Sequence, residues 1–132
     1  MNKLKVAASA LGIFTGLAGA SHGPGEILQG NVAPSNAIFQ AWPSLTALGG
    51  EPAMTIIPNL LVTGVLTIIV GALLAVWAAK FISRKHGGLV LILLTIVLLL
   101  VGGGIVPPLF GIAAGVIATV LNFMGTKNGG VD

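Results

Sequence analysis

Lys80-Phe81-Ile82-Ser83-Arg84-Lys85-His86 is the stretch that decides how this chain folds, because it holds every formal charge between Glu51 and Lys127. Long apolar runs flank it on both sides. A cation in the hydrocarbon of a bilayer costs roughly 2.5 to 3.5 kcal/mol on insertion scales, so these charges should lie at a membrane surface. Basic loops between membrane spans stay in the cytoplasm. We therefore expect residues 80–88 to form a cytoplasmic loop between two transmembrane helices.

The composition of the chain also indicates a membrane protein. Its 132 residues are 55% hydrophobic and 7% charged, whereas soluble domains carry about 25% charged residues. The basic residues are split among the N-terminus, one loop and the C-terminal tail, which argues against a nucleic-acid partner. The absence of cysteine excludes disulfides, thiolate metal sites and cysteine nucleophiles. The predicted fold class is an all-α membrane protein, and the lipid bilayer is its predicted partner.

Residues 1–20 have two interpretations. Basic residues precede an apolar run that ends in Ala18-Gly19-Ala20, which is the pattern of a signal peptide with its cleavage site. As a helix the same run is about 25 Å long. It carries Gly12 and Gly16 on one face, which suits a retained transmembrane helix that packs closely against another. Retention gives a small bundle of four transmembrane helices, and cleavage leaves three.

Residues 21–55 form a polar segment rich in proline and glycine, and we expect this segment to lie outside the cell. Within residues 36–48, apolar side chains recur at helical spacing and predict a short helix in the membrane interface. Phe39 and Trp42 would anchor that helix among the lipid headgroups. Because Glu26 belongs to this external segment, no ionisable side chain is expected within a span.

Residues 56–132 predict three further transmembrane helices, at about 58–81, 88–104 and 107–123, followed by a short cytoplasmic tail. The last helix is only about 25 Å long, so two arrangements stay open for residues 102–123, a plain hairpin and a partly re-entrant segment. Small residues at fourfold spacing predict two helix-packing faces. These are Thr63, Thr67, Gly71 and Ala75 on the first of the three helices, and Gly111, Gly115 and Thr119 on the last.

The charges predict one orientation for every span. Lys80, Arg84 and Lys85 would mark the inner surface, where they can contact anionic lipid headgroups. If residues 1–20 are retained, both termini are cytoplasmic. We expect a multi-pass protein of the plasma membrane, from a prokaryote.

No constellation of residues indicates a reaction. The serines lack the Gly-x-Ser-x-Gly setting of an activated nucleophile. His22 and Glu26 supply two ligands, whereas a zinc site needs three or four from the protein. His86 is expected on the opposite side of the membrane from His22. We therefore expect no enzymatic activity, no metal and no cofactor.

Two functions follow as hypotheses. The first is a structural or accessory component that acts through helix–helix association, as a homo-oligomer or beside other membrane-protein subunits, because small-residue faces allow close contact. The alternative is a channel or carrier for a small neutral solute. In that case Thr63, Thr67 and Thr119 would line its path.

Overall fold

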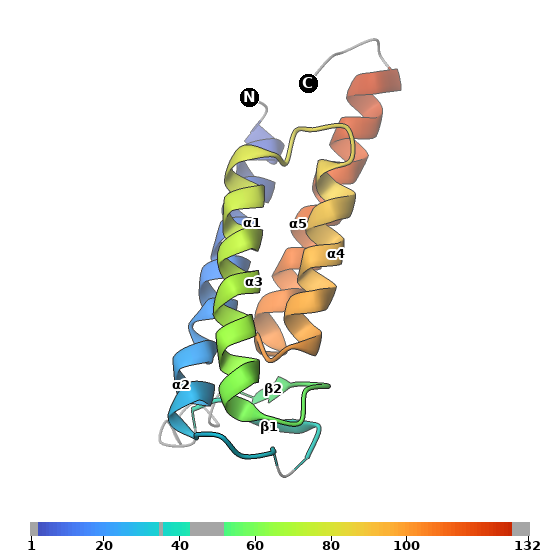
Figure 1. The fold of residues 1–132 in the computed structure, drawn as a ribbon. Coiled ribbons are helices and arrows are strands. Elements are labelled where there is room, and N and C mark those ends of the chain that lie inside the picture. Colours follow the sequence, from blue (N-terminus) through green and yellow to red (C-terminus); the bar gives the residue numbers. More distant parts are fainter. Residues whose placement is uncertain (1–2, 35, 43–51, 128–132) are drawn as a thin grey trace.

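The computed structural model describes residues 3–34, 36–42 and 52–127, which form an antiparallel helical bundle with two short strands at one end (Figure 1). The helices are α1 (Lys3–Ala20), α2 (His22–Leu28), α3 (Leu60–Lys80), α4 (Gly87–Leu100) and α5 (Val106–Lys127). The strands β1 (Ile38–Gln40) and β2 (Pro52–Met54) pair antiparallel, with Phe39 opposite Ala53. α2 follows α1 almost directly, so the bundle has four helical segments.

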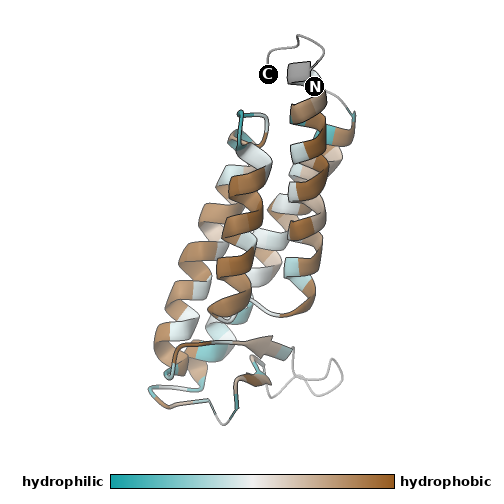
Figure 2. Ribbon diagram, turned by 90° about the vertical axis from the view of Figure 1, so that its right-hand side faces the viewer, coloured by the Kyte–Doolittle hydropathy of each residue, from teal (hydrophilic) through white to brown (hydrophobic). Residues whose placement is uncertain are grey.

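Three of these segments are long and apolar enough to cross a membrane, namely Lys3–Leu28, Leu60–Lys80 and Val106–Gly125. α4 is also apolar but has 14 residues. Hydrophobic residues run along the helices, and hydrophilic residues gather mainly at the two ends (Figure 2). The prediction of a helical fold with membrane-compatible helices is therefore confirmed.

The two ends of the bundle differ in what they carry. The start of α1, the end of α5 and the loop between α3 and α4 lie together at one end, called here the basic end (Figure 1). β1, β2, α2 and the turn between α4 and α5 lie at the other, called here the strand end. The basic loop and the polar segment that follows α1 are thus separated by the length of the helices.

Glycine allows α1 and α3 to approach each other closely. A Cβ atom placed on Gly71 would lie 2.6 Å from the carbonyl oxygen of Gly16, and one placed on Gly12 would lie 2.5 Å from the Cβ of Ala78. Neither distance is tolerated between real atoms, so only glycine fits at these contacts. Ala75 lines the same interface, because a Cβ on Gly16 would also collide with its side chain.

The second interface joins α5 to α4 and α1. A Cβ on Gly111 would lie 2.5 Å from the hydroxyl oxygen of Thr95, and one on Gly115 would lie 2.9 Å from the carbonyl oxygen of Gly88. The apolar core lies between the two interfaces. Every one of the four helical segments contributes residues to it, and Ile82 comes from the loop after α3. The buried residues of the core are Ala8, Leu74, Ala78, Ile82, Leu91, Leu98, Ala114 and Ala118.

α5 is longer than the predicted helix over residues 107–123, because it begins at Val106 and continues to Lys127. Pro107 and Pro108 lie in its first turn. The nitrogen atoms of the first turn need no helical hydrogen bond, so proline is tolerated there. With 22 residues α5 is about 33 Å long. The re-entrant alternative depended on a helix of about 25 Å, which is too short to cross a bilayer, and α5 is longer than that. α4 and α5 pack side by side as a hairpin (Figure 1).

The prediction of a short helix over residues 36–48 is wrong at its start, where β1 occupies Ile38–Gln40. Residues 43–51 lie outside the described residues. Residues 22–28, which belong to the predicted polar segment, are helical. Ser21 keeps helical backbone angles, and α2 then carries the chain through Leu28.

Replacing Gly16 by leucine should destabilise the bundle, because the new side chain would force α1 away from the backbone of α3. We expect a loss of about 3 kcal/mol or more in the free energy of unfolding, at the upper end for overpacked sites. The measurement is the midpoint of unfolding in a denaturing detergent, followed by circular dichroism. Ala72, which is exposed on α3, provides the control variant Ala72→Leu, and equal losses for the two variants would contradict this packing.

Candidate functional site

α2 brings the side chain of Glu26 into the bundle, where it is 0% exposed. The backbones of α2 and α3 can approach there because glycines face each other. A Cβ on Gly64 would lie 2.6 Å from the carbonyl oxygen of Gly23. Thr67, the eighth residue of α3, faces Glu26 about 10 Å along the helix from its first residue. The carboxyl group therefore lies well inside the strand end of the bundle.

The hydroxyl of Thr67 connects Glu26 to the end of α4. Its oxygen lies 3.1 Å from Oε1 of Glu26 and 2.9 Å from the backbone carbonyl oxygen of Val101. The second carboxyl oxygen, Oε2, is buried and has no hydrogen-bond partner among the described residues. One threonine thus joins α2, α3 and the segment that follows α4.

That segment, residues 101–104, is called here the glycine turn, and it lies directly over the carboxyl group. A Cβ on Gly102 would lie 2.8 and 3.0 Å from the two oxygens of Glu26. Gly102 and Gly104 have φ angles of +112° and +91°, a region that other residues rarely adopt. The turn needs glycine both for its backbone conformation and for its contact with Glu26.

His22 lies one helical turn before Glu26 and is 3% exposed. Its Nδ1 atom lies 2.9 Å from the carbonyl oxygen of Ala18. A carbonyl oxygen only accepts, so Nδ1 carries the hydrogen of this bond and Nε2 faces the other way. A Cβ on Gly104 would lie 2.6 Å from Nε2. The glycine turn therefore contacts both ionisable side chains of α2.

Two further threonines close the site, Thr55 just after β2 and Thr63 on α3. The hydroxyl oxygens of Thr55 and Thr63 lie 3.0 Å apart, and the Thr55 oxygen accepts a hydrogen bond from the backbone N–H of Ile57. The backbone of Thr55 pairs with that of Val101. We call these five buried residues the polar cluster: His22, Glu26, Thr55, Thr63 and Thr67. In the described part of the chain, no group of three or more histidine or acidic residues could hold a metal ion.

Glu26 was expected in a segment outside the helices that could span a membrane, and the structure corrects this placement. The first helical segment that could cross a membrane extends to Leu28 and includes Glu26. Gly23-Pro24-Gly25 suggested that the helix ends before this point. One signal in the sequence could have found the site, since α2 carries polar residues at positions 22 and 26 and α3 at positions 63 and 67, the same spacing of four.

A pocket of about 410 Å³ opens next to the polar cluster, between α1 and α5. The rings of Phe14 and Phe110 contact each other edge to face, with centroids 5.7 Å apart. Trp42 donates a hydrogen bond from its indole N–H to the carbonyl oxygen of Ser21, and its position in the membrane interface stays a prediction. The pocket is lined by Phe14, Ala18, Ser21, His22, Trp42, Val106, Pro107 and Phe110. It is an apolar, aromatic recess with a histidine in its wall.

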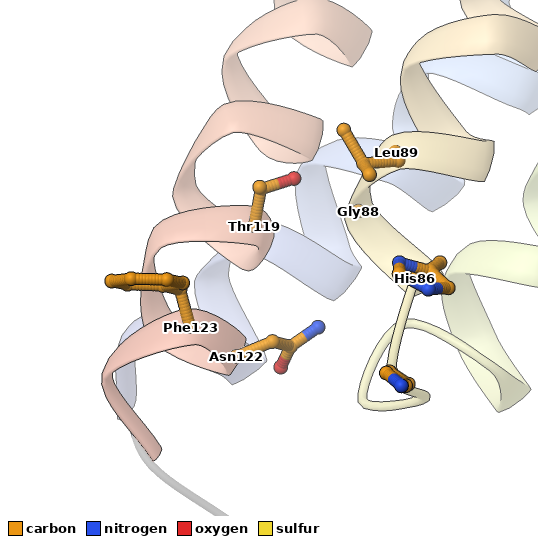
Figure 3. A pocket seen from close by; sticks show the side chains of 7 residues that line it. His86, Gly88, Leu89, Thr119, Asn122 and Phe123 are labelled. Atoms are coloured by element: carbon orange, nitrogen blue, oxygen red, sulfur yellow. The ribbon is translucent and has the colours of Figure 1, made fainter. Parts of the chain in front are cut away.

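Of the threonines predicted to line a solute path, Thr63 and Thr67 belong to the polar cluster and Thr119 does not. The hydroxyl of Thr119 donates to the carbonyl oxygen of Gly115 on its own helix, towards the basic end. There it lines a second pocket, of about 250 Å³, between α4 and α5 (Figure 3). Thr63 and Thr67 therefore lie nearer the strand end of the bundle, and Thr119 lies nearer the basic end.

The basic loop forms one wall of this second pocket. The side-chain amide of Asn122 donates to the carbonyl oxygens of Ile82 and Arg84, at 3.0 and 3.1 Å, and so fixes the loop to α5. Lys85 and His86 line the pocket, whereas the guanidinium of Arg84 lies 5.4 Å from the ring centroid of Phe81. Lys80 is exposed at the end of α3. Contact of these cations with lipid headgroups stays a prediction.

No protein-family model, curated protein or solved structure matches the chain.

Replacing Thr67 by valine keeps the shape of the side chain but removes the hydroxyl that serves both Glu26 and Val101. We expect a loss of about 1 to 3 kcal/mol in the free energy of unfolding, because two buried polar groups lose their partner. The matched control is Thr95→Val. Thr95 is also fully buried, but its hydroxyl donates to the Leu91 carbonyl of its own helix. Unfolding in detergent measures both variants, and a loss no greater for Thr67→Val than for the control would contradict the role of this contact.

Proposed function

We propose that the protein is a small multi-pass membrane protein that carries a small solute coupled to a proton, and that Glu26 is the group that binds the proton. The observation that carries this proposal is the complete burial of a carboxyl group inside a bundle of apolar helices. Ionisable side chains are costly within a membrane, and where they occur they usually mark the path of an ion, proton or substrate.

The lengths of the helices and the positions of the charges support a membrane-spanning arrangement. α3 has 21 residues and is about 31 Å long, close to the hydrocarbon thickness of about 30 Å. With the basic loop in the cytoplasm, the strand end faces outward and Glu26 lies in the outer part of the bilayer. We also propose that residues 1–20 are retained in the plasma-membrane protein, because Gly12 and Gly16 of α1 fit against α3.

The chemistry of the pocket beside His22 suggests the kind of solute. Aromatic and aliphatic side chains form most of its wall, with the imidazole of His22 and Ser21 among them. Such a recess suits a small solute with an apolar body and one polar group. The pocket reaches the polar cluster through His22, so a solute bound there would lie within about one helical turn of the group that exchanges the proton.

Association with other chains stays a prediction with less support than the sequence suggested. The small residues that favoured it face partners within the same chain. They are Gly12, Gly16, Gly71 and Ala75 at one interface and Gly111 and Gly115 at the other. These residues therefore offer no free face for another subunit, and the polar cluster is the stronger basis for a function.

Purified protein in liposomes that contain a pH-sensitive dye tests the proposed function. Pools of small solutes, such as hydrophobic amines, neutral aromatic compounds and amino acids, are added outside. We expect one pool to change the internal pH, with a rate reduced at least about tenfold by Glu26→Gln, which cannot exchange the proton. Thr95→Val should retain the wild-type rate. The proposal is contradicted if no pool changes the internal pH, or if Glu26→Gln moves protons as fast as the wild type.

A further inference from the structure

We propose that the proton on Glu26 holds the glycine turn closed, so that its release opens the polar cluster to water at the strand end. This inference rests on the proposed function, because it describes how the same carboxyl group controls access to its site. Its basis is the single hydrogen of the Thr67 hydroxyl, which two oxygen neighbours share.

Thr67 has one hydroxyl hydrogen and two oxygen neighbours within hydrogen-bond distance. The carbonyl oxygen of Val101, at 2.9 Å, can only accept a hydrogen bond. Oε1 of Glu26, at 3.1 Å, accepts when the carboxyl is ionised and can donate when it is protonated. Both contacts are fully satisfied only if Glu26 donates to Thr67 and Thr67 donates to Val101. The geometry therefore corresponds to a neutral carboxyl group with its proton on Oε1.

The surroundings of the second oxygen agree with that count. Oε2 has no hydrogen-bond partner among the described residues. In a protonated carboxyl group Oε2 is a neutral carbonyl oxygen, whereas in an ionised one it would share a full negative charge. Burial without a partner costs much more for a charged oxygen than for a neutral one.

Loss of the proton changes which bonds Thr67 can make. The O–H bond of Glu26 breaks, the proton passes to water, and the electron pair stays on the carboxylate. The single hydrogen of Thr67 then goes to the carboxylate, because a bond to an ionised acceptor is stronger than one to a carbonyl oxygen. Val101 loses its donor. The carboxylate also needs water, and the backbone of Gly102 lies directly against both of its oxygens.

The hydrogen bonds around the glycine turn allow it to move as a short unit. The carbonyl oxygen of Leu100, just before it, accepts from Ile56, and the N–H of Ile105, just after it, donates to Pro52. These two bonds fix the ends of the turn on the segment around β2. Between them, the N–H groups of Val101 and Gly103 donate to carbonyl oxygens of α4, which hold the turn to the end of that helix. Gly102 and Gly104 lack side chains and can change backbone angles at little steric cost. Opening can thus stay local to residues 101–104.

One other titratable group among the described residues must be considered. His22 faces Gly104 from α2. From the other elements packed around Glu26, the facing side chains are those of Thr63 and Thr67 on α3, and Thr55 lies beside them. The turn itself consists of Val101 and three glycines. Separate replacements of Glu26 and His22 therefore distinguish the two groups as the source of a pH-dependent opening.

The test uses a single cysteine at Val101, whose side chain is 9% exposed in the closed turn. The chain contains no cysteine of its own, so Val101→Cys can be labelled selectively in detergent with a water-soluble maleimide. Thiol reactivity itself rises with pH, and Ile56→Cys, at a position that is 71% exposed, provides the reference rate. The quantity measured is the ratio of the two labelling rates.

We expect this ratio to rise about tenfold from acidic to alkaline pH, in line with the loss of one buried hydrogen bond. With Glu26→Gln it should stay low at every pH, because the amide group donates to Thr67 permanently. With Thr67→Val it should stay high, whereas Thr67→Ser and Thr95→Val should behave as the wild type. His22→Gln should retain the pH dependence.

Three results would overturn this inference: a ratio that does not change with pH in the wild-type background, a pH dependence that persists with Glu26→Gln, or one that disappears with His22→Gln. The two proposals can fail separately. A constant ratio together with Glu26-dependent proton movement in liposomes removes the switch but leaves the carrier. A pH-dependent ratio without solute-coupled proton movement removes the carrier but leaves the switch.

Discussion

The arrangement at the strand end depends on one hydroxyl group, that of Thr67. A carboxyl group buried away from bulk solvent requires hydrogen-bond partners inside the protein. Thr67 supplies that partner to Glu26 and at the same time contacts the backbone of Val101. The end of the first helical segment, the middle of α3 and the turn after α4 therefore meet at a single polar contact. In an apolar bundle such a contact restricts how these segments can pack.

The close packing of the helices makes this contact possible. Glycine at positions 23 and 64 brings the backbone of α2 against that of α3, and glycine at positions 16 and 71 does the same for α1. With larger residues at these positions the helices would separate, and the side chain of Glu26 would no longer lie within reach of Thr67. The small residues thus act first within the chain. They set the distance at which the side chains of Glu26 and Thr67 can meet.

The sequence predicts the helical fold well, because the lengths of the apolar runs and the position of the basic loop can be read without knowing which segments contact each other. It does not predict the site, for reasons that differ between elements. Pro24 and its neighbouring glycines are typical helix breakers, yet α2 continues because packing against α3 outweighs their poor propensity. β1 depends on pairing with β2, which local periodicity cannot reveal. Gly71 was recognisable as part of a packing face, but its partner Gly16 could be identified only from the fold.

Infrared spectroscopy of the purified protein tests the central claim most directly, because a protonated carboxyl group and a carboxylate absorb at different frequencies. The measurement is the spectrum at neutral pH of the wild type minus that of Glu26→Gln. A buried, hydrogen-bonded and neutral Glu26 predicts a protonated-carboxyl band in this difference, shifted by exchange into heavy water and altered by Thr67→Val. A difference that contains only carboxylate bands would contradict the account.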